Sequence, residues 1–175
     1  NASRGSVVDN AALLRHLRRR QGPAVVLDVW EGEPDINAAL LDYVSLGTAH
    51  IAGYSYDGKL RATQMLCAAL AAHMRCMLPG NIAVAPATNV LWVRPGLAGA
   101  QLLRFLLTAR YDIAADDALL RQAVAPNAMA PAPQGFDRLR REYPERRELA
   151  GSTVSGVDLD AEAVALVEAM GCRYV

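Results

Sequence analysis

The feature that most constrains the fold is a continuous apolar segment near the start of the chain, AVVLDV at residues 24–29. A strand with one exposed face alternates apolar and polar residues, whereas a strand covered on both faces is apolar at nearly every position. The breakers Gly22 and Pro23 precede this segment, and the WEGEPD that follows cannot continue a strand. We therefore expect a strand that is covered on both faces, as in a parallel sheet.

Helical and strand patterns alternate along the first seventy or so residues. Asp9 can cap a helix through AALLRHLRRR at 11–20. We expect a short helix over INAALLDYV at 36–44, a short strand over SLGTA at 45–49, and a long helix over 59–78. This alternation predicts βαβ units and a parallel sheet.

The second half of the chain has a different pattern. We expect, in order, a strand at 89–95, helices at 99–110, 116–124 and 136–149, a strand at 152–157, a helix at 158–171 and a strand at 172–175. The breaker LPGN separates this half from the long helix before it. We predict two domains, an α/β portion over residues 1–78 and a small α+β domain with a short sheet over residues 79–175.

Composition narrows the class of protein. The sequence is 53% hydrophobic, and Lys plus Arg and Asp plus Glu both number 18, so net charge gives no general reason to expect a nucleic-acid or membrane partner. The three cysteines match no CxxC or zinc spacing, which favours free thiols in a reducing cytoplasm and no metal site. No segment predicts a membrane span, and the start does not resemble a signal peptide. We expect a soluble, cytoplasmic α/β protein.

Polar side chains follow the expected strands of the first half. Arg4 lies just past the expected end of a strand at the start of the sequence, Asp28 lies at the end of the 24–29 strand, and His50 lies just past the 45–49 strand. Glu33 lies in the loop after the 24–29 strand. Ligands of open parallel sheets bind beyond the carboxyl ends of the strands. These four side chains should therefore line one edge of the sheet.

Together, these residue types suit one kind of chemistry. A histidine with a carboxylate in reach is a general acid–base pair, and an arginine can hold a substrate carboxylate. The set suits oxidation of a 2-hydroxy acid, in which His50 takes the hydroxyl proton while a hydride passes to a nicotinamide. Each residue also has an ordinary structural interpretation, because Glu33 precedes Pro34, Asp28 can cap a turn, and Arg4 and His50 can simply be exposed. From the residues alone, the ordinary structural interpretation is the one favoured, and the catalytic interpretation stays open beside it.

Three motifs carry a family resemblance. NASRGSVVDNAALL, LDVWEGEP and AHIAGYS, in this order, resemble the C-terminal part of the Rossmann-type nucleotide-binding domain of D-2-hydroxyacid dehydrogenases. YDIAADDALLR and FDRLRREYPERREL narrow the resemblance to one branch of that family and extend it to about residue 157. That branch oxidises 4-phospho-D-erythronate to 2-oxo-3-hydroxy-4-phosphobutanoate with NAD, in pyridoxal 5'-phosphate biosynthesis.

The resemblance implies roles for the matching residues. It makes His50 the catalytic acid–base, Glu33 its carboxylate partner, and Arg4 the group that holds the substrate carboxylate and hydroxyl oxygen. The implied NAD-binding positions are Ala2, Ser3, Arg4, Asp28 and Gly53, and the implied substrate-binding position is Tyr54. The resemblance also implies a cytoplasmic homodimer formed through the second domain, with a small phosphorylated 2-hydroxy acid as substrate.

The sequence departs from the family in one respect, because it contains no GxGxxG loop. Such a loop at a helix N-terminus holds the dinucleotide pyrophosphate, so we expect this chain alone to have little NAD affinity and to expose apolar sheet edges. We expect a substrate domain and the first half of the NAD domain to precede these residues. Two alternatives stay open: a non-catalytic dimerisation or binding fragment, and a dehydrogenase for another D-2-hydroxy acid. The arginines of residues 138–147 can pair with interleaved glutamates or help to grip a phosphate.

Overall fold

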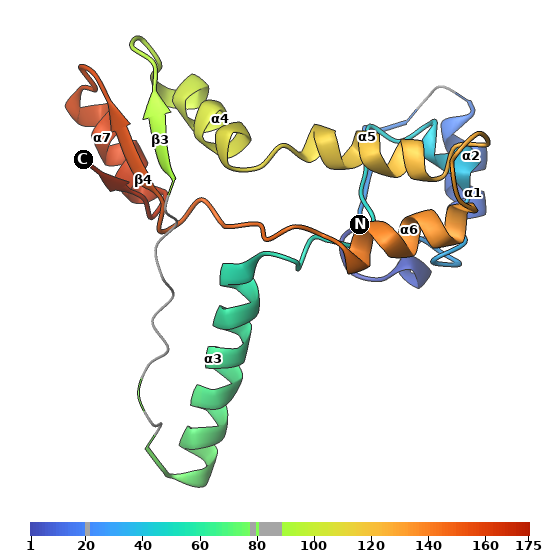
Figure 1. Cartoon of the computed structure of the whole chain (residues 1–175), viewed down its shortest axis with the longest axis horizontal. Coiled ribbons are helices and arrows are strands. Elements are labelled where there is room, and N and C mark those ends of the chain that lie inside the picture. The colour runs from blue at the N-terminus through green and yellow to red at the C-terminus, as the bar shows by residue number, and fades with distance from the viewer. Residues whose placement is uncertain (20–21, 78–79, 81–88) are drawn as a thin grey trace. The chain divides into compact units, whose positions relative to one another are not determined.

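The computed structural model describes residues 1–19, 22–77, 80 and 89–175, and these residues form two compact units. The first unit consists of Asn1–Gly53 and Asp112–Pro144, and the second of Tyr54–Tyr111 and Glu145–Val175. Figure 1 shows the elements of each unit in chain order. The predicted domain boundary between residues 78 and 79 lies outside the described residues.

The first unit is built around a short parallel sheet. Its elements are a 3₁₀ turn (Gly5–Val7), α1 (Asn10–Leu17), β1 (Val26–Leu27), α2 (Ala38–Leu41), β2 (Leu46–Gly47), α5 (Ile113–Ala123) and α6 (Ala132–Arg141). The two strands pair in parallel, with Val26 opposite Leu46 and Leu27 opposite Gly47. The parallel βαβ arrangement predicted from the alternating pattern is therefore confirmed.

Residue 1 extends this sheet on the far side of β1. The amino group of Asn1 donates to the Val26 carbonyl at 2.8 Å, and the Asp28 N–H donates to the Asn1 carbonyl at 2.9 Å. The helix that follows begins where the sequence predicts, because an Asp9 carboxylate oxygen accepts from the Ala12 N–H at 2.7 Å. Asn1 is thus hydrogen-bonded to β1 in the way that a residue of a neighbouring strand would be.

The apolar run that predicted the sheet is not covered on both faces along its whole length. Leu27 is 2% exposed and packs into the core of the first unit, whereas Val26, which points to the other face, is 47% exposed. Coverage of both faces is therefore incomplete at Val26, although Asp28 on the same face is buried. The reason is that α1, α2, α5 and α6 all contribute to a core on the Leu27 side.

Two helices of the second half belong to the first unit. Leu120 of α5 and Phe136 of α6 are fully buried in the same core as Leu27 and Trp30. In Figure 1 these helices, yellow and orange, lie beside the blue elements of the N-terminal region. Residues 112–144 are therefore not part of the second compact unit, although the sequence pattern grouped them with residues 79–175.

The second unit has a core of its own. Its elements are α3 (Tyr56–Met74), β3 (Val90–Val93), α4 (Gly99–Arg110), β4 (Thr153–Gly156), α7 (Ala161–Ala169) and β5 (Arg173–Tyr174). The strands form a sheet in the order β3-β4-β5, and both pairings are parallel. Leu102 and Leu106 of α4 and Val167 of α7 are fully buried against Val154 of β4.

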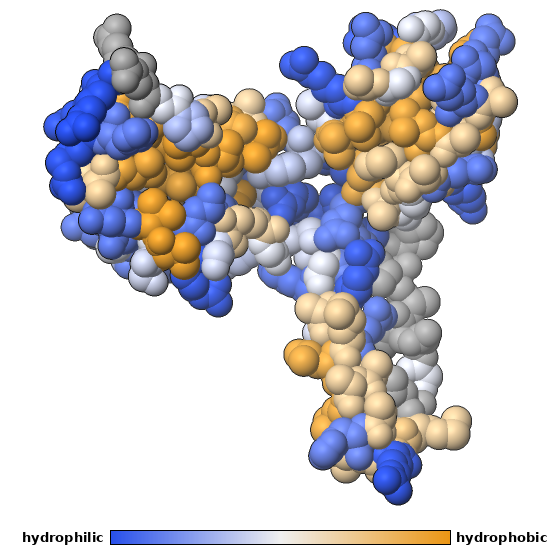
Figure 2. Space-filling model, turned by 180° about the vertical axis from the view of Figure 1, so that it is seen from behind, coloured by the Kyte–Doolittle hydropathy of each residue, from blue (hydrophilic) through white to orange (hydrophobic). Residues whose placement is uncertain are grey.

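Helix α3 is apolar along much of its length but is mostly exposed. Ser55 caps it by accepting from the Gly58 N–H at 3.1 Å, and of its own residues only Asp57 and Ala71 are buried. Leu66 is 73% exposed, and Figure 2 shows apolar side chains along this helix. In the part of the chain that the structure describes, this helix and the others are all too short or too polar to cross a bilayer.

The first turn of α3 is fixed by an ion pair with a distant segment. Arg147 donates to Asp57 through Nε and Nη2, with contacts of 2.8–3.2 Å, and the Glu148 N–H donates to the same carboxylate at 2.7 Å. Glu148 in turn accepts from Ser55 Oγ at 2.8 Å. Arg147 therefore pairs with a residue 90 positions earlier in the sequence.

Candidate active site

A histidine and a carboxylate form a hydrogen-bonded pair at the carboxyl edge of the first sheet. His50 follows β2 by three residues, and its Nδ1 lies 2.7 Å from Glu33 Oε2. The other Glu33 oxygen accepts from the Trp30 N–H at 2.8 Å, which fixes the carboxylate. The side chains of His50 and Glu33 are 31% and 19% exposed, so solvent and ligands can reach the pair.

The backbone at His50 adopts an unusual conformation. Its φ of 55° lies in the left-handed region, which non-glycine residues enter at a cost and mostly at functional or tightly held positions. The His50 N–H donates to the Asp28 carbonyl at 2.7 Å, so this conformation is held against the end of β1. The imidazole is thus directed to Glu33 by a fixed backbone.

Asp28 has a structural task beside this pair. Its side chain is buried and accepts from the Thr48 hydroxyl at 2.6 Å, from the Ile51 N–H at 2.8 Å and from the Ala52 N–H at 3.0 Å. These donors lie on both sides of His50. Asp28 therefore fixes the loop that presents the histidine, while its expected contact with NAD remains a proposal.

Arg4 lies at the same edge but outside the hydrogen-bonded pair. Its exposed guanidinium donates to the Ser3 carbonyl at 2.7 Å. The next residue, Gly5, fits closely against the loop after β1, since a Cβ there would stand only 2.0 Å from the Trp30 carbonyl oxygen. Glycine at this position lets the Arg4 turn approach the loop that carries Glu33.

The other predicted positions are less constrained. Ala2, Ser3 and Gly53 are exposed, and no heavy atom lies within 4 Å of the place where a Gly53 Cβ would stand. Tyr54 belongs to the second unit, where the Lys59 ammonium lies 4.2 Å from its ring centre. The structure therefore brings together Asp28, Glu33 and His50.

Sequence reasoning missed several supporting residues. Thr48 and Trp30 hold the ends of the two strands, because the Trp30 indole N–H donates to the Thr48 carbonyl at 2.9 Å. Asn10 and Glu31 exchange backbone-to-side-chain hydrogen bonds of 2.7 and 3.2 Å, which ties the start of α1 to the same loop. Of these residues, Trp30 was the one that the sequence could have indicated. An aromatic residue next to the acidic loop EGEP is typical of a buried side chain that holds such a loop in place.

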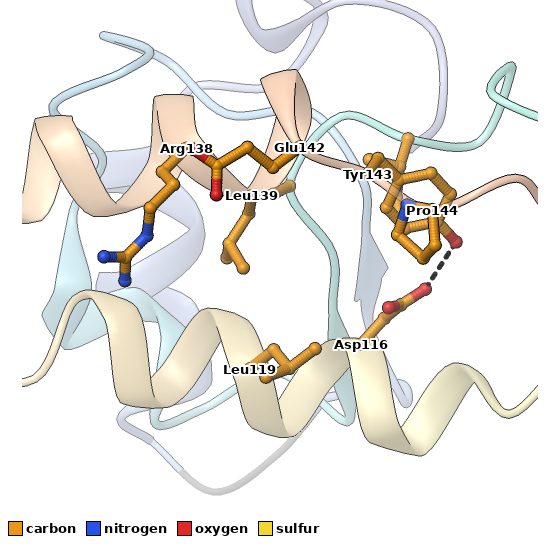
Figure 3. A pocket seen from close by; sticks show the side chains of 9 residues that line it. Asp116, Leu119, Arg138, Leu139, Glu142, Tyr143 and Pro144 are labelled. Atoms are coloured by element: carbon orange, nitrogen blue, oxygen red, sulfur yellow. Dashed lines mark hydrogen bonds between the residues drawn. The ribbon is translucent and has the colours of Figure 1, made fainter.

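A cavity of about 210 Å³ lies near this edge, between α5 and α6. Figure 3 shows Leu119 and Asp116 on one side of it and Leu139, Glu142 and Tyr143 on the other. Tyr143 donates to Asp116 at 2.8 Å, and neither His50 nor Glu33 lines the cavity. It is smaller than the roughly 300–1,000 Å³ of typical small-molecule sites, so we place the chemistry at the strand ends.

Comparisons with known proteins found two family models and several curated relatives that match the chain. Residues 1–52 match the family model for the D-isomer specific 2-hydroxyacid dehydrogenase NAD binding domain, and residues 86–171 match a domain of unknown function, DUF3410. The chain is 48% identical over 155 residues to erythronate-4-phosphate dehydrogenase of Cellvibrio japonicus, covering 85% of this chain and 40% of that protein. It is 42% identical over 178 residues to the enzyme of the same name from Enterobacter sp., covering 100% of this chain and 45% of that protein.

A third relative, from Marinobacter nauticus and also named erythronate-4-phosphate dehydrogenase, is 43% identical over 157 residues, which are 88% of this chain and 41% of that protein. The chain thus spans less than half the length of these curated relatives. The match to the NAD-binding family coincides with the segment that carries Asp28, Glu33 and His50. Residues 1–52 therefore match the D-isomer specific 2-hydroxyacid dehydrogenase family, and the chain as a whole is similar to relatives named erythronate-4-phosphate dehydrogenase.

Proposed function

We propose that this chain is the C-terminal part of an NAD-dependent dehydrogenase that oxidises 4-phospho-D-erythronate to 2-oxo-3-hydroxy-4-phosphobutanoate, in pyridoxal 5'-phosphate biosynthesis. The observation that carries the proposal is the His50–Glu33 pair, 2.7 Å apart at the carboxyl edge of a parallel sheet. It lies within a segment that matches an NAD binding domain. Relatives at 42–48% identity that are named for this substrate support the choice of 4-phospho-D-erythronate.

The geometry assigns each group of the pair a task. An ionised carboxylate can only accept, so Glu33 requires the proton on His50 Nδ1 and leaves Nε2 free of hydrogen. Nε2 can then take the proton of a substrate hydroxyl as the hydride leaves the adjacent carbon. Glu33 stabilises the imidazolium that forms, because it lies 2.7 Å from Nδ1.

Arg4 supplies the positive charge that the substrate requires. Among the residues that the structure describes, its exposed guanidinium donates to the Ser3 carbonyl, and a substrate carboxylate could replace this weaker acceptor. We propose that Arg4 turns to hold the substrate carboxylate and the hydroxyl oxygen that becomes a carbonyl. Tyr54 is the proposed further substrate contact.

The residues of this chain fit one end of NAD. The backbone of Ala2, Ser3 and Gly53 is exposed beside the strand ends, so a flat ring can approach it, and Asp28 holds the neighbouring loop. When bound, NAD accepts the hydride. The sequence holds no GxGxxG, so we propose that the pyrophosphate is held by a part of the complete polypeptide outside these residues.

We also propose a cytoplasmic homodimer that forms through the second unit. Val90 and Trp92 point to the open face of its sheet and are 36% and 69% exposed, while Leu91 and Val93 are buried. An exposed tryptophan on a sheet face is a common anchor of protein interfaces. Figure 2 shows further apolar surface on this unit.

The experiment that tests the function is a His50→Ala substitution in the complete polypeptide. We expect kcat for 4-phospho-D-erythronate to fall about 10²- to 10⁴-fold, which is the usual loss when a general base is removed. His16→Ala is the matched control, because His16 is exposed on α1, and it should keep full activity. Full activity of His50→Ala would exclude the assignment.

Two other functions can be separated from this one. The first is a non-catalytic dimerisation module, which would be supported if the complete polypeptide neither bound NADH nor oxidised any hydroxy acid. A dehydrogenase for another D-2-hydroxy acid would show a higher kcat/KM for that acid than for 4-phospho-D-erythronate. Fluorescence titration with NADH and a panel of phosphorylated and plain hydroxy acids distinguish these cases.

A further inference from the structure

A partly buried ion pair on α5 holds the outer edge of β2. Asp117 Oδ1 accepts from the Gly47 N–H at 2.7 Å, and Asp117 Oδ2 accepts from Arg121 Nε at 2.8 Å. Arg121 also donates through Nη1 to the Leu41 carbonyl at 2.7 Å and through Nη2 to the Val44 carbonyl at 3.2 Å. We refer to Asp117 and Arg121 as the clasp.

At the outer edge of β2, the clasp supplies a hydrogen-bond acceptor that a neighbouring strand would otherwise supply. An edge strand leaves backbone groups unpaired on its outer side, and here a helix side chain accepts from the Gly47 N–H. Burial alone would raise the pKa of Asp117, but the hydrogen bond and charge of Arg121, with the Gly47 N–H, hold it below its ordinary value. The carboxylate is thus ionised and bound at neutral pH.

Position 47 has no room for a side chain. A Cβ at Gly47 would stand 2.5 Å from Leu41 Cδ1 and 2.9 Å from Trp30 Cζ2, so β2 is pressed against the core on one side while the clasp binds it on the other. The next residue, Thr48, is held by the Trp30 indole and by Asp28. His50 is two residues further along the chain.

We propose that Asp117 and Arg121 are positioning residues for the acid–base histidine, so that α5, which lies within the match to a domain of unknown function, sets where His50 stands. This inference rests on the proposed function. The clasp touches neither the substrate nor His50, and it acts through β2. A shift of about 1 Å in a catalytic group can lower a rate up to 10²-fold, so a well-packed edge strand matters for turnover.

The test compares Asp117→Ala with Asp117→Asn, whose amide oxygen can still accept from Gly47, and with Asp112→Ala. Asp112 caps the same helix by accepting from the Ala114 and Ala115 N–H groups, so its loss weakens α5 without touching β2. We expect Asp117→Ala to lower kcat of the complete polypeptide on the order of tenfold, with KM changed less than about twofold. Asp117→Asn should restore most of kcat, and Asp112→Ala should leave it within about twofold.

A second measurement is independent of activity. In this chain, NMR can follow amide exchange at Gly47 and the Nδ1–H proton that His50 donates to Glu33. Asp117→Ala should speed Gly47 exchange about tenfold or more and broaden the His50 proton signal. If both signals are unchanged, or if Asp112→Ala alters them equally, the clasp does not position His50. An unsubstituted complete polypeptide that fails to oxidise 4-phospho-D-erythronate would remove the proposed function, but the NMR result would still decide whether the clasp holds β2.

Discussion

The two units contain similar sheets with different surroundings. In the first, the residues that follow the strands are hydrogen-bonded to one another, as Asp28, Glu33 and His50 show. In the second, the strand ends are followed by Arg94 and Val157, and the histidine of that unit, His73, lies on α3. Short parallel strands packed on helices therefore do not define a catalytic site; the polar residues placed after them do.

The open sheet faces differ in the same way. In the first unit Val26 is the exposed apolar side chain of β1, while in the second Trp92 offers a much larger apolar surface on β3. We infer a division of work, with chemistry at the edge of the first sheet and association at the face of the second.

The largest expected effect on stability comes from a substitution that disrupts one core and leaves the other intact. Phe136 is fully buried in the first core, so Phe136→Ala should reduce the free energy of unfolding by about 3 to 5 kcal/mol. Hydrogen exchange should show the loss of protection in β1 and β2. The peptides of β3 and β4 should keep theirs.

The converse substitution provides the control for this prediction. Val154 is fully buried in the second core, and Val154→Ala should expose β3 and β4 while β1 and β2 stay protected. Loss of protection in both sheets with either substitution would mean that the units unfold as one. The division into separate working regions would then be wrong.

Local patterns predicted much of the first unit. The Asp9 cap, the parallel pairing of the 24–29 and 45–49 segments, and the placement of Asp28, Glu33 and His50 at one edge all follow from short-range rules. Each of these features depends on the type of the residue and on its distance along the chain from the end of a strand. This is the kind of information that periodicity and turn residues carry.

Long-range partners could not be predicted in the same way. The apolar spacing of α6 shows that Phe136 faces a core but not which core, and the exposure of Val26 depends on which elements cover the sheet. Asp117 and Arg121 have the i, i+4 spacing of an ordinary surface ion pair. Their contacts with β2 are determined by tertiary packing alone.

The next largest effect is expected from the loss of a buried ion pair, and an exposed ion pair of the same unit serves as its comparison. The Asp57 side chain is 7% exposed, so Arg147→Ala leaves a buried carboxylate without its partner and should cost on the order of 3 kcal/mol. Arg61 is the control, because its 3.5 Å contact with Glu148 is exposed and Arg61→Ala should cost at most about 1 kcal/mol. Urea unfolding of the three proteins gives both values.

The cost of Arg147→Ala should depend on pH. Burial would raise the pKa of Asp57, but the hydrogen bonds and charge of Arg147, with the Glu148 N–H, hold it below its ordinary value of 3.8. A lowered pKa in the folded state stabilises the protein above the unfolded pKa, and this stability is lost as the pH falls through the folded pKa. The difference between wild type and Arg147→Ala should therefore be full at about pH 7 and shrink below about pH 4. A difference that does not change with pH would show that Arg147 acts through packing alone.

The smallest effect on folding, and the sharpest test of the division of work, is expected at Trp92. Because Trp92 is 69% exposed, Trp92→Ser should change the free energy of unfolding by no more than about 0.5 kcal/mol. If the open face of β3 is the dimer interface, the same substitution removes an aromatic anchor, and the dissociation constant should rise tenfold or more. Sedimentation velocity over a micromolar range of chain concentrations measures this change.

Leu107→Ser is the matched control, since Leu107 is 47% exposed on α4, outside the sheet face, and it should leave association unchanged. Equal association of Trp92→Ser and wild type would place the interface elsewhere, and the exposed apolar surface of α3 would become the next region to substitute.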